Sequence, residues 1–470
     1  MDTLPSEVGR RVQISTALIA SLGGLVFGYD SGAMSGALLF LKTAFHLTPF
    51  GREAMVSVII IGAMAGSLIA SQLADQVGRR TTLLIASTGA AVFAVMAGFS
   101  PTYAVFILSR FLVGIAVGLI VVSAPMYISE ASRTASRGGA SATFQLAVAV
   151  GLTSSYWGDY FFSKSGDWHG MFMVAAIPAV LLFLLFLRLP DTPRWYFMHG
   201  LHTQAQAALA RFNNADEVAR ETTRIQNELA VTETLDHGSY RDLLNPKIRM
   251  AVVFGIGFSI FQQFSGINTV TYYSPTVFRF AGFPRSDSIL ITAVIGLITI
   301  LATVLGIALV DRWGRRPLMF SSLTGMGLAM FLLGLAFRIG PQSPGMAYLT
   351  IGSVTLYHIA FSFGMGLMGW VLLPEIFPTR LRARGQAVGR FANWVANFAV
   401  TISFLSVVAA VGAANTFWLF TAFIVAALVF IWRMAPETRN RPLETIEKYW
   451  ENGMKWDVTS SGNAESTDVK

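Results

Sequence analysis

"DQVGRR", residues 75–80, recurs as "DRWGRR", residues 311–316, and each copy directly follows a long apolar run. Two further charged clusters repeat in the same order: "EASRTASRG" (130–138) as "EIFPTRLRARG" (375–385), and "LPDTPR" (189–194) as "APETRNR" (435–441). Three matched clusters at similar offsets indicate an internal duplication. The chain therefore predicts two repeated halves that share one architecture.

The composition is that of a membrane protein. Of 470 residues, 54% are hydrophobic and 13% are charged, and the mean hydropathy is +0.57, whereas about one quarter of a soluble domain is charged. About twelve runs are long and apolar enough to cross a bilayer, which takes roughly 20 apolar residues each. Because they are continuously apolar, they predict helices rather than barrel strands. The runs cover approximately 14–40, 54–73, 81–99, 103–127, 139–162, 170–189, 250–280, 288–310, 317–337, 347–373, 385–411 and 414–433.

The predicted fold is an all-α membrane protein with twelve transmembrane helices in two six-helix bundles and a small cytoplasmic helical linker domain. "HTQAQAALARF" and "EVARETTRIQNELA" give the linker its helical periodicity. The chain end, "TSSGNAESTDVK", is polar enough to predict disorder. The expected units are an N-terminal bundle (1–189), the linker (190–249), a C-terminal bundle (250–433) and a cytoplasmic tail (434–470).

The charges indicate topology rather than nucleic-acid binding. Most of the 34 lysines and arginines fall in the N-terminus, in every second loop and in the tail, although Arg110 and Arg390 lie in or near spans. By the positive-inside rule, both termini are expected in the cytoplasm. The absence of an Asn-x-Ser/Thr sequon fits a bacterial inner membrane. No cysteine, metal-spaced histidine cluster or phosphate-binding glycine loop occurs, so we expect neither an enzyme nor a metal or cofactor.

Two polar features stand inside the apolar runs. "GGLVFGYDSGAMSG" (23–36) carries Asp30 with no other charge between Arg11 and Lys42. "FQQFSGINTVTYYS" (261–274) carries several uncharged donors and acceptors, which suit hydroxyl groups without the cost of a charge. Gly266 weakens this helix, and broken helices at mid-membrane often mark binding sites. Alternatively, the amides hold helices together at about 0.6 kcal/mol each.

The motifs together resemble the sugar porter family of the major facilitator superfamily over essentially the whole chain. They are, in family order, "GGLVFGYDSGAMSG", "ADQVGRR", "SRFLVGIAVG", "PMYISEASRTASRG", "LPDTPRW", "QQFSGINTVTYYSPTVF", "VDRWGRRPL", "WVLLPEIFP", "RFANWVANF" and "PETRNRPLETIE". The resemblance implies a carrier for a neutral monosaccharide, a hexose or pentose, whose halves alternate between outward-open and inward-open states. It also implies a monomer in a lipid bilayer.

The resemblance and the polar cluster give the expected sugar contacts: Phe27, Gln145, Gln262, Gln263, Asn268, Tyr272, Thr299, Trp370, Asn393 and Asn397. The indole of Trp370 suits stacking on a sugar ring. Thr299 stands where relatives often carry asparagine, so the preferred sugar is left open, and Gly369 replaces the proline common before the tryptophan. Trp394 fits packing as well as a site role, and His358 fits a satisfied core residue.

The resemblance pairs Asp30 with Arg110, and proton-linked bacterial relatives carry an aspartate at this place. Protonating Asp30 removes its hold on Arg110, which is the minimum for coupling a proton to sugar transport. Three alternatives stay open: a static ion pair in a facilitative uniporter, a sugar sensor that binds without carrying, and efflux of drugs or organic acids. The last is disfavoured because the expected site carries neutral amides rather than cations.

The repeated charged clusters are expected to latch the inner ends of the bundles and to break when the site opens inward. The alternative is that they only anchor topology. The expected latch residues are Asp75, Arg79, Arg80, Glu130, Arg137, Arg194, Asp311, Arg315, Arg316, Glu375, Arg384 and Glu437.

Overall fold

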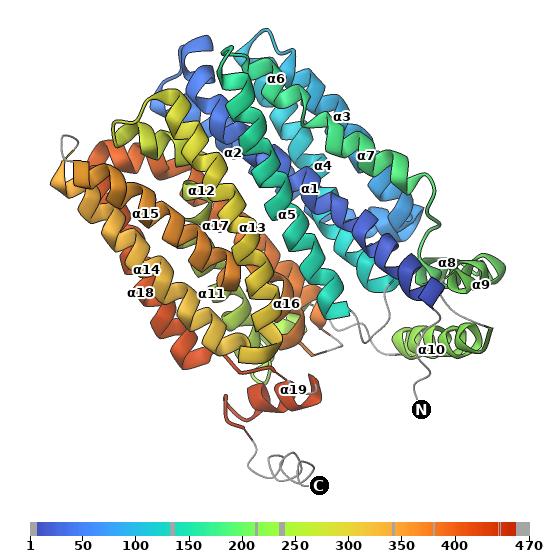
Figure 1. The fold of residues 1–470 in the computed structure, drawn as a ribbon. Helices are drawn as coiled ribbons and strands as arrows, with labels where there is room; N and C mark the ends of the chain where they lie inside the picture. Colours follow the sequence, from blue (N-terminus) through green and yellow to red (C-terminus); the bar gives the residue numbers. More distant parts are fainter. Residues whose placement is uncertain are drawn as a thin grey trace.

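Two groups of long helices stand side by side in the structure, a computed structural model (Figure 1). It describes residues 7–131, 137–211, 215–234, 240–340, 344–378, 381–439, 441 and 443–456. Eleven helices or joined helix pairs are long and apolar enough to cross a membrane. A further helix, α5, has 27 residues and packs among them. The described elements therefore agree with the predicted twelve-helix, all-α fold.

The N-terminal half contains α1 (Glu7–Ala44), α2 (Pro49–Val77), α3 (Arg79–Gly98), α4 (Tyr103–Ala131), α5 (Arg137–Ser163), α6 (Trp168–Met173) and α7 (Ala176–Phe186). The C-terminal half contains α11 (Arg249–Phe264), α12 (Ile267–Phe280), α13 (Arg285–Trp313), α14 (Arg315–Ile339), α15 (Pro344–Ala360), η3 (Phe361–Met365), α16 (Gly366–Ile376), α17 (Arg382–Val411) and α18 (Ala413–Met434). Most of the long helices extend beyond the predicted apolar runs, because helical hydrogen bonding continues past the hydrocarbon core.

A glycine seam joins α1 to α5. Gly24, Gly28, Gly32 and Gly36 follow one another at every fourth residue, so they share one face of α1. A Cβ atom at any of them would clash with the backbone or short side chains of α5. At the end of the seam, the Gly36 N–H donates to the buried carboxylate of Asp159 at 3.0 Å. The two helices therefore pack at backbone contact, as small-residue spacing allows in membranes.

Two spans of the C-terminal half are broken near the middle of their length. Gly266 has φ +93° and separates α11 from α12, as the sequence predicted. The second break, the π-helical turn η3, was not predicted. Ser322 of α14 bridges this turn, because its hydroxyl donates to the Ala360 carbonyl at 2.6 Å and accepts from the Met365 N–H at 3.0 Å. A side chain inserted into the helical ladder is a known cause of such a break.

Short helices cover one end of the bundles, which we call the linker face (Figure 1). They are α8 (Pro193–Met198), α9 (His202–Ala210), α10 (Ala215–Thr234), the 3₁₀ turn η2 (Tyr240–Leu244) and α19 (Leu443–Glu451). The helix α19 docks through Trp450, whose Nε1 donates to the Ile376 carbonyl at 3.0 Å. Part of the tail is thus folded, and the segment predicted to be disordered lies outside the described residues.

Candidate functional site

A cavity of about 190 Å³ lies between the two halves. Its walls come from α1, α4 and α5 on one side and from α11–α13 and α15–α17 on the other. The size fits one small solute rather than a drug-sized ligand. All ten predicted sugar contacts lie in its wall: Phe27, Gln145, Gln262, Gln263, Asn268, Tyr272, Thr299, Trp370, Asn393 and Asn397.

Four amides form a hydrogen-bonded chain along this wall. The Gln262 Nε2 donates to the Met365 carbonyl of the η3 turn at 2.7 Å, and its Oε1 accepts from the Asn393 Nδ2 at 3.0 Å. The Asn393 Oδ1 accepts from Gln263 at 2.9 Å, and Gln263 in turn accepts from the Asn268 Nδ2 at 2.5 Å. An amide has two donors and an acceptor with two lone pairs. The chain thus fixes the amides and leaves polar capacity for a solute.

Trp370 connects the halves on the side of the cavity nearer the linker face. Its Nε1 donates to the Gln145 Oε1 at 2.8 Å, and its ring lies 4.9 Å from the ring of Phe144. The guanidinium of Arg390 lies over the indole, 4.4 Å from the ring centroid. The indole is therefore held from both halves and forms one end of the cavity.

The indole of Trp394 and the hydroxyl of Thr299 also belong to the wall of the cavity. Trp394 lines the cavity and meets Phe27 edge-on at 6.4 Å, so packing and lining are combined in one side chain. The Thr299 hydroxyl donates to the Ile295 carbonyl of its own helix at 2.9 Å. Only its lone pairs remain for a solute, whereas an amide there would also offer donors.

Asp30 and Arg110 form a buried ion pair between α1 and α4. The two guanidinium nitrogens lie 2.5 Å and 3.1 Å from the two carboxylate oxygens. The residues are 3% and 1% exposed. A two-point contact of this kind is the strong form of a charge-assisted hydrogen bond. The structure therefore contains the Asp30–Arg110 ion pair that the resemblance implied. This geometry fits both a static bridge and a proton switch.

Tyr272 lies between the ion pair and the cavity. It lines a small pocket together with Ser31 and Arg110 of the N-terminal half. It also lines the main cavity together with Asn397 of the C-terminal half. A single side chain of α12 therefore touches the sugar-facing wall, both halves and the surroundings of the ion pair.

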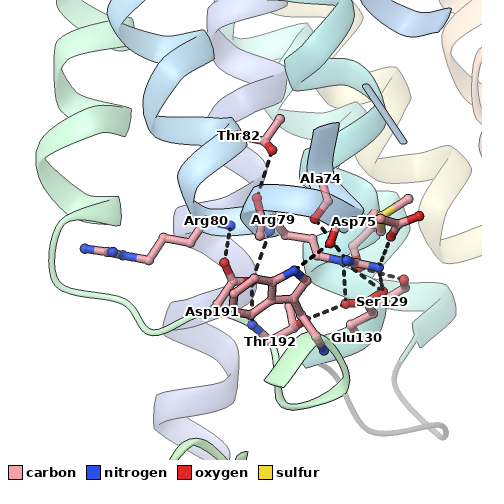
Figure 2. Close-up of polar contacts among 12 residues, drawn as sticks. Ala74, Asp75, Arg79, Arg80, Thr82, Ser129, Glu130, Asp191 and Thr192 are labelled. Atoms are coloured by element: carbon pink, nitrogen blue, oxygen red, sulfur yellow. Dashed lines mark hydrogen bonds and ion pairs between the residues drawn. The ribbon is translucent and has the colours of Figure 1, made fainter. Parts of the chain in front are cut away.

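The charged cluster of the N-terminal half closes on itself at the linker face (Figure 2). Arg79 pairs with Asp75 at 2.8 Å and with Glu130 at 3.0 Å. The Asp191 carboxylate accepts the backbone N–H groups of Arg79 and Arg80 at 3.0 Å and 3.1 Å, which places a negative charge at the start of α3. Burial raises the pKa of the Asp191 carboxyl, while these backbone hydrogen bonds oppose the rise.

The C-terminal half repeats this arrangement, with Glu437 in the place of Asp191. Arg315 pairs with Asp311 at 3.2 Å and with Glu375 at 3.0 Å. The Glu437 carboxylate accepts the N–H groups of Arg315 and Arg316, each at 3.0 Å. Each cluster thus ties helix ends within its own half, and among the described contacts these residues make no ion pair from one half to the other.

The structure places the other three expected latch residues only by their helices. Arg194 lies in the first turn of α8 and Arg384 in the first turn of α17, both beside the clusters in sequence. Arg137 begins α5, and its side chain lies outside the described part of the chain. The described ion pairs of Arg79 and Arg315 lie within one half each, and a latch between the bundles stays a prediction.

Replacing Asp191 by alanine is expected to lower the stability of the protein by about 1–2 kcal/mol, because two N–H groups at the start of α3 lose their acceptor. Asp191→Asn keeps one acceptor oxygen and is expected to cost less. The measurement is the thermal unfolding midpoint of the purified protein. Asp216→Ala, an exposed position on α10, is the matched control. Equal midpoints for the two alanine variants would contradict the assigned role.

Some functional positions were missed or misread from the sequence. His358 lines the cavity, and its Nε2 has no hydrogen-bond partner among the described residues, so the expectation of a satisfied core histidine is wrong. Arg390 also lines the cavity, which contradicts the expectation of a site without cations. The sequence position of Arg390 could have indicated this, because Arg390 precedes the predicted sugar contact Asn393 by one turn of the same helix.

Comparison with known proteins places the chain in a family. A family model described as "Sugar (and other) transporter" matches residues 16–450. The chain belongs to this sugar transporter family. The transporter is 35% identical over 442 residues to the galactose-proton symporter of Escherichia coli (strain K12), covering 93% of this chain and 94% of that one. It is 33% identical over 457 residues to the arabinose-proton symporter of Bacillus subtilis (strain 168), covering 95% and 97%.

Solved structures agree with the sequence comparison. The major facilitator superfamily proton:xylose symporter XylE bound to 6-bromo-6-deoxy-D-glucose matches with a TM-score of 0.79 and 31% identity, covering 94% of this chain and 100% of that one. The inward-open xylose transporter XylE from E. coli matches with a TM-score of 0.80 and 30% identity, covering 93% and 100%. The sugar transporter therefore has the predicted major facilitator fold and is a multi-pass membrane carrier, not an enzyme.

Proposed function

We propose that this sugar transporter is a proton symporter for a monosaccharide, hexose or pentose, in the inner membrane. The observation that carries the proposal is a buried Asp30–Arg110 pair beside a cavity lined by neutral amides. Relatives named as galactose- and arabinose-proton symporters support it, as does one named a D-xylose transporter. Asp30 is the proton-coupling group, and no bound cofactor takes part.

In the proposed mechanism the amides bind sugar hydroxyls and Trp370 packs against the ring. A proton on Asp30 weakens its pairing with Arg110 and so favours one conformation over the other. Tyr272 transmits the change, since it lines both the pocket beside Arg110 and the main cavity. Proton and sugar then act on one conformational equilibrium from adjacent places.

Alternating access requires that contacts between the halves break at one end at a time. On the side away from the linker face, the Glu53 carboxylate of α2 accepts the N–H and the hydroxyl of Ser406 of α17, both at 2.6 Å. On the other side, Trp370 donates to Gln145 at 2.8 Å. Opening toward either side must break one of these contacts. The charged clusters, being internal to each half, keep the helix ends of that half together.

The proposed orientation places the linker face and both termini in the cytoplasm, because the basic loops gather there. The proposed units are the two bundles (1–189 and 250–433), the linker (190–249) and the tail (434–470), acting as a monomer in the lipid bilayer. A facilitative uniporter and a sugar sensor are the competing functions that the experiment must separate.

Purified protein in proteoliposomes is expected to accumulate one of galactose, xylose or arabinose when an inward proton gradient is applied, with an inward proton current. Dissipating the gradient should stop accumulation but leave sugar counterflow. Uptake without a current and without dependence on the gradient would identify a uniporter. Sugar binding without counterflow would identify a sensor. A Gln262→Ala, Gln263→Ala double variant serves as a control for specific uptake, because it removes two amides of the cavity wall.

A further inference from the structure

Arg390 is a charged residue inside the sugar cavity. It lies about two turns into α17 from the linker face, and it lines the cavity together with Trp370 and Asn393. Its guanidinium lies 4.4 Å from the centroid of the Trp370 indole. Within the described chain it forms no hydrogen bond or ion pair. None of the described residues that line the cavity is acidic.

An unpaired arginine in a transmembrane helix is costly, and such residues normally have a partner. The acidic groups buried within the spans are engaged elsewhere: Asp30 with Arg110, Glu53 with Ser406 and Asp159 with the Gly36 N–H. The cation–π contact offsets only part of the cost. It also leaves the five N–H donors in the guanidinium plane unused.

We propose that the missing partner arrives with the substrate, and that the transporter carries a sugar acid of the uronate class. The carboxylate binds the Arg390 guanidinium, which offers two parallel N–H groups to such a group. The sugar hydroxyls bind the amide chain, since Asn393 lies one turn from Arg390 on the same helix and bonds Gln262 and Gln263. The ring packs on Trp370. This inference rests on the proposed sugar-binding role of the cavity and narrows its substrate class.

A carboxylate fits the charge of the cavity better than a phosphate. One guanidinium balances the single charge of a uronate, whereas a sugar phosphate carries nearly two negative charges at neutral pH. Among the described lining residues there is no second permanent cation. The size of the cavity, about 190 Å³, also favours a single ring with one carboxylate over a larger anion.

Binding to matched pairs of sugars tests the inference. D-Glucuronate and D-galacturonate differ from D-glucose and D-galactose only in the carboxylate, so each pair isolates its contribution. We expect at least tenfold tighter binding of a uronate than of its parent hexose, measured by quenching of intrinsic tryptophan fluorescence in the full-length protein. Glucose 6-phosphate and inorganic phosphate are expected to compete weakly.

Variants of Arg390 identify the group responsible. Arg390→Met removes the charge while keeping an unbranched chain over Trp370, and it should lower the ratio of uronate to hexose affinity at least tenfold. Arg390→Lys should keep part of the ratio. Arg338→Met, at an exposed position in the last turn of α14, is the matched control and should leave the ratio unchanged. A ratio that Arg390→Met does not alter would overturn the inference, as would tighter binding of phosphate than of uronate.

Transport measurements separate this inference from the proposed function. A neutral hexose entering with one proton carries a net positive charge, whereas a uronate entering with one proton carries none. We therefore expect hexose uptake to give an inward current and labelled uronate uptake to give little or none. Hexose transport with no uronate binding would overturn the sugar-acid inference and leave the proposed function standing. Uronate and hexose binding with no transport of either would overturn the proposed function and the carriage of a sugar acid, and would leave only the binding of the carboxylate by Arg390.

Discussion

Asp30→Asn is expected to abolish accumulation of sugar against its gradient, while sugar counterflow continues at a measurable rate. Asparagine keeps the shape of the side chain and one acceptor oxygen, but it cannot be protonated or carry a charge. The carboxylate now holds the Arg110 guanidinium at two points, so its neutral replacement mimics the protonated state at every pH. The protein should then respond to sugar alone. Accumulation and counterflow are both measured in proteoliposomes with and without a pH gradient.

Asp159→Asn provides a matched control for this experiment. Asp159 is also a buried carboxyl of the N-terminal half, at 1% exposure, but its described contact is the Gly36 N–H rather than an arginine. An asparagine oxygen can still accept that hydrogen bond, so accumulation should persist. Accumulation by the Asp30→Asn protein, or loss of accumulation in both variants, would mean that proton coupling does not depend on the Asp30–Arg110 pair.

Arg110→Met is expected to destabilise the folded protein by about 3–5 kcal/mol, because it leaves the Asp30 carboxylate buried without its partner. The double variant Asp30→Asn, Arg110→Met removes both charges and should recover much of the loss. Thermal unfolding midpoints of the two variants and of the single Asp30→Asn variant complete a double-mutant cycle. If the double variant were no more stable than Arg110→Met, the two residues would not be coupled as their geometry indicates.

The fold was predictable because its determinants are local or repeated. Apolar runs of bilayer length specify helices, and the recurrence of "DQVGRR" as "DRWGRR" specifies two equivalent halves. The break at Gly266 was also predictable, since glycine readily adopts the positive φ that it has there. The π-helical turn η3 was not, because it depends on Ser322 from a different helix.

The sequence predicted which residues form the site better than it predicted the hydrogen bonds among them. The ten predicted residues lie around one cavity, yet neither the amide chain nor the contact of Trp370 with Gln145 follows from spacing along the sequence. The charged clusters illustrate the limit. Arg79 and Arg315 occupy equivalent places in the repeats, so sequence alone does not decide whether each pairs within its half or across. The folded chain pairs Arg79 with Glu130 and Arg315 with Glu375, which keeps both clusters internal.

The glycine seam holds α1 and α5 together as one rigid pair. Each of its glycines sits against the α5 backbone or a short side chain, so a slip by one position would drive larger side chains such as Leu25 into the neighbouring helix. Sliding of one helix along the other is therefore sterically blocked. Because α5 carries Gln145 and α1 carries Asp30, we expect α1 and α5 to move together, so that a displacement at the sugar contacts also displaces the proton site.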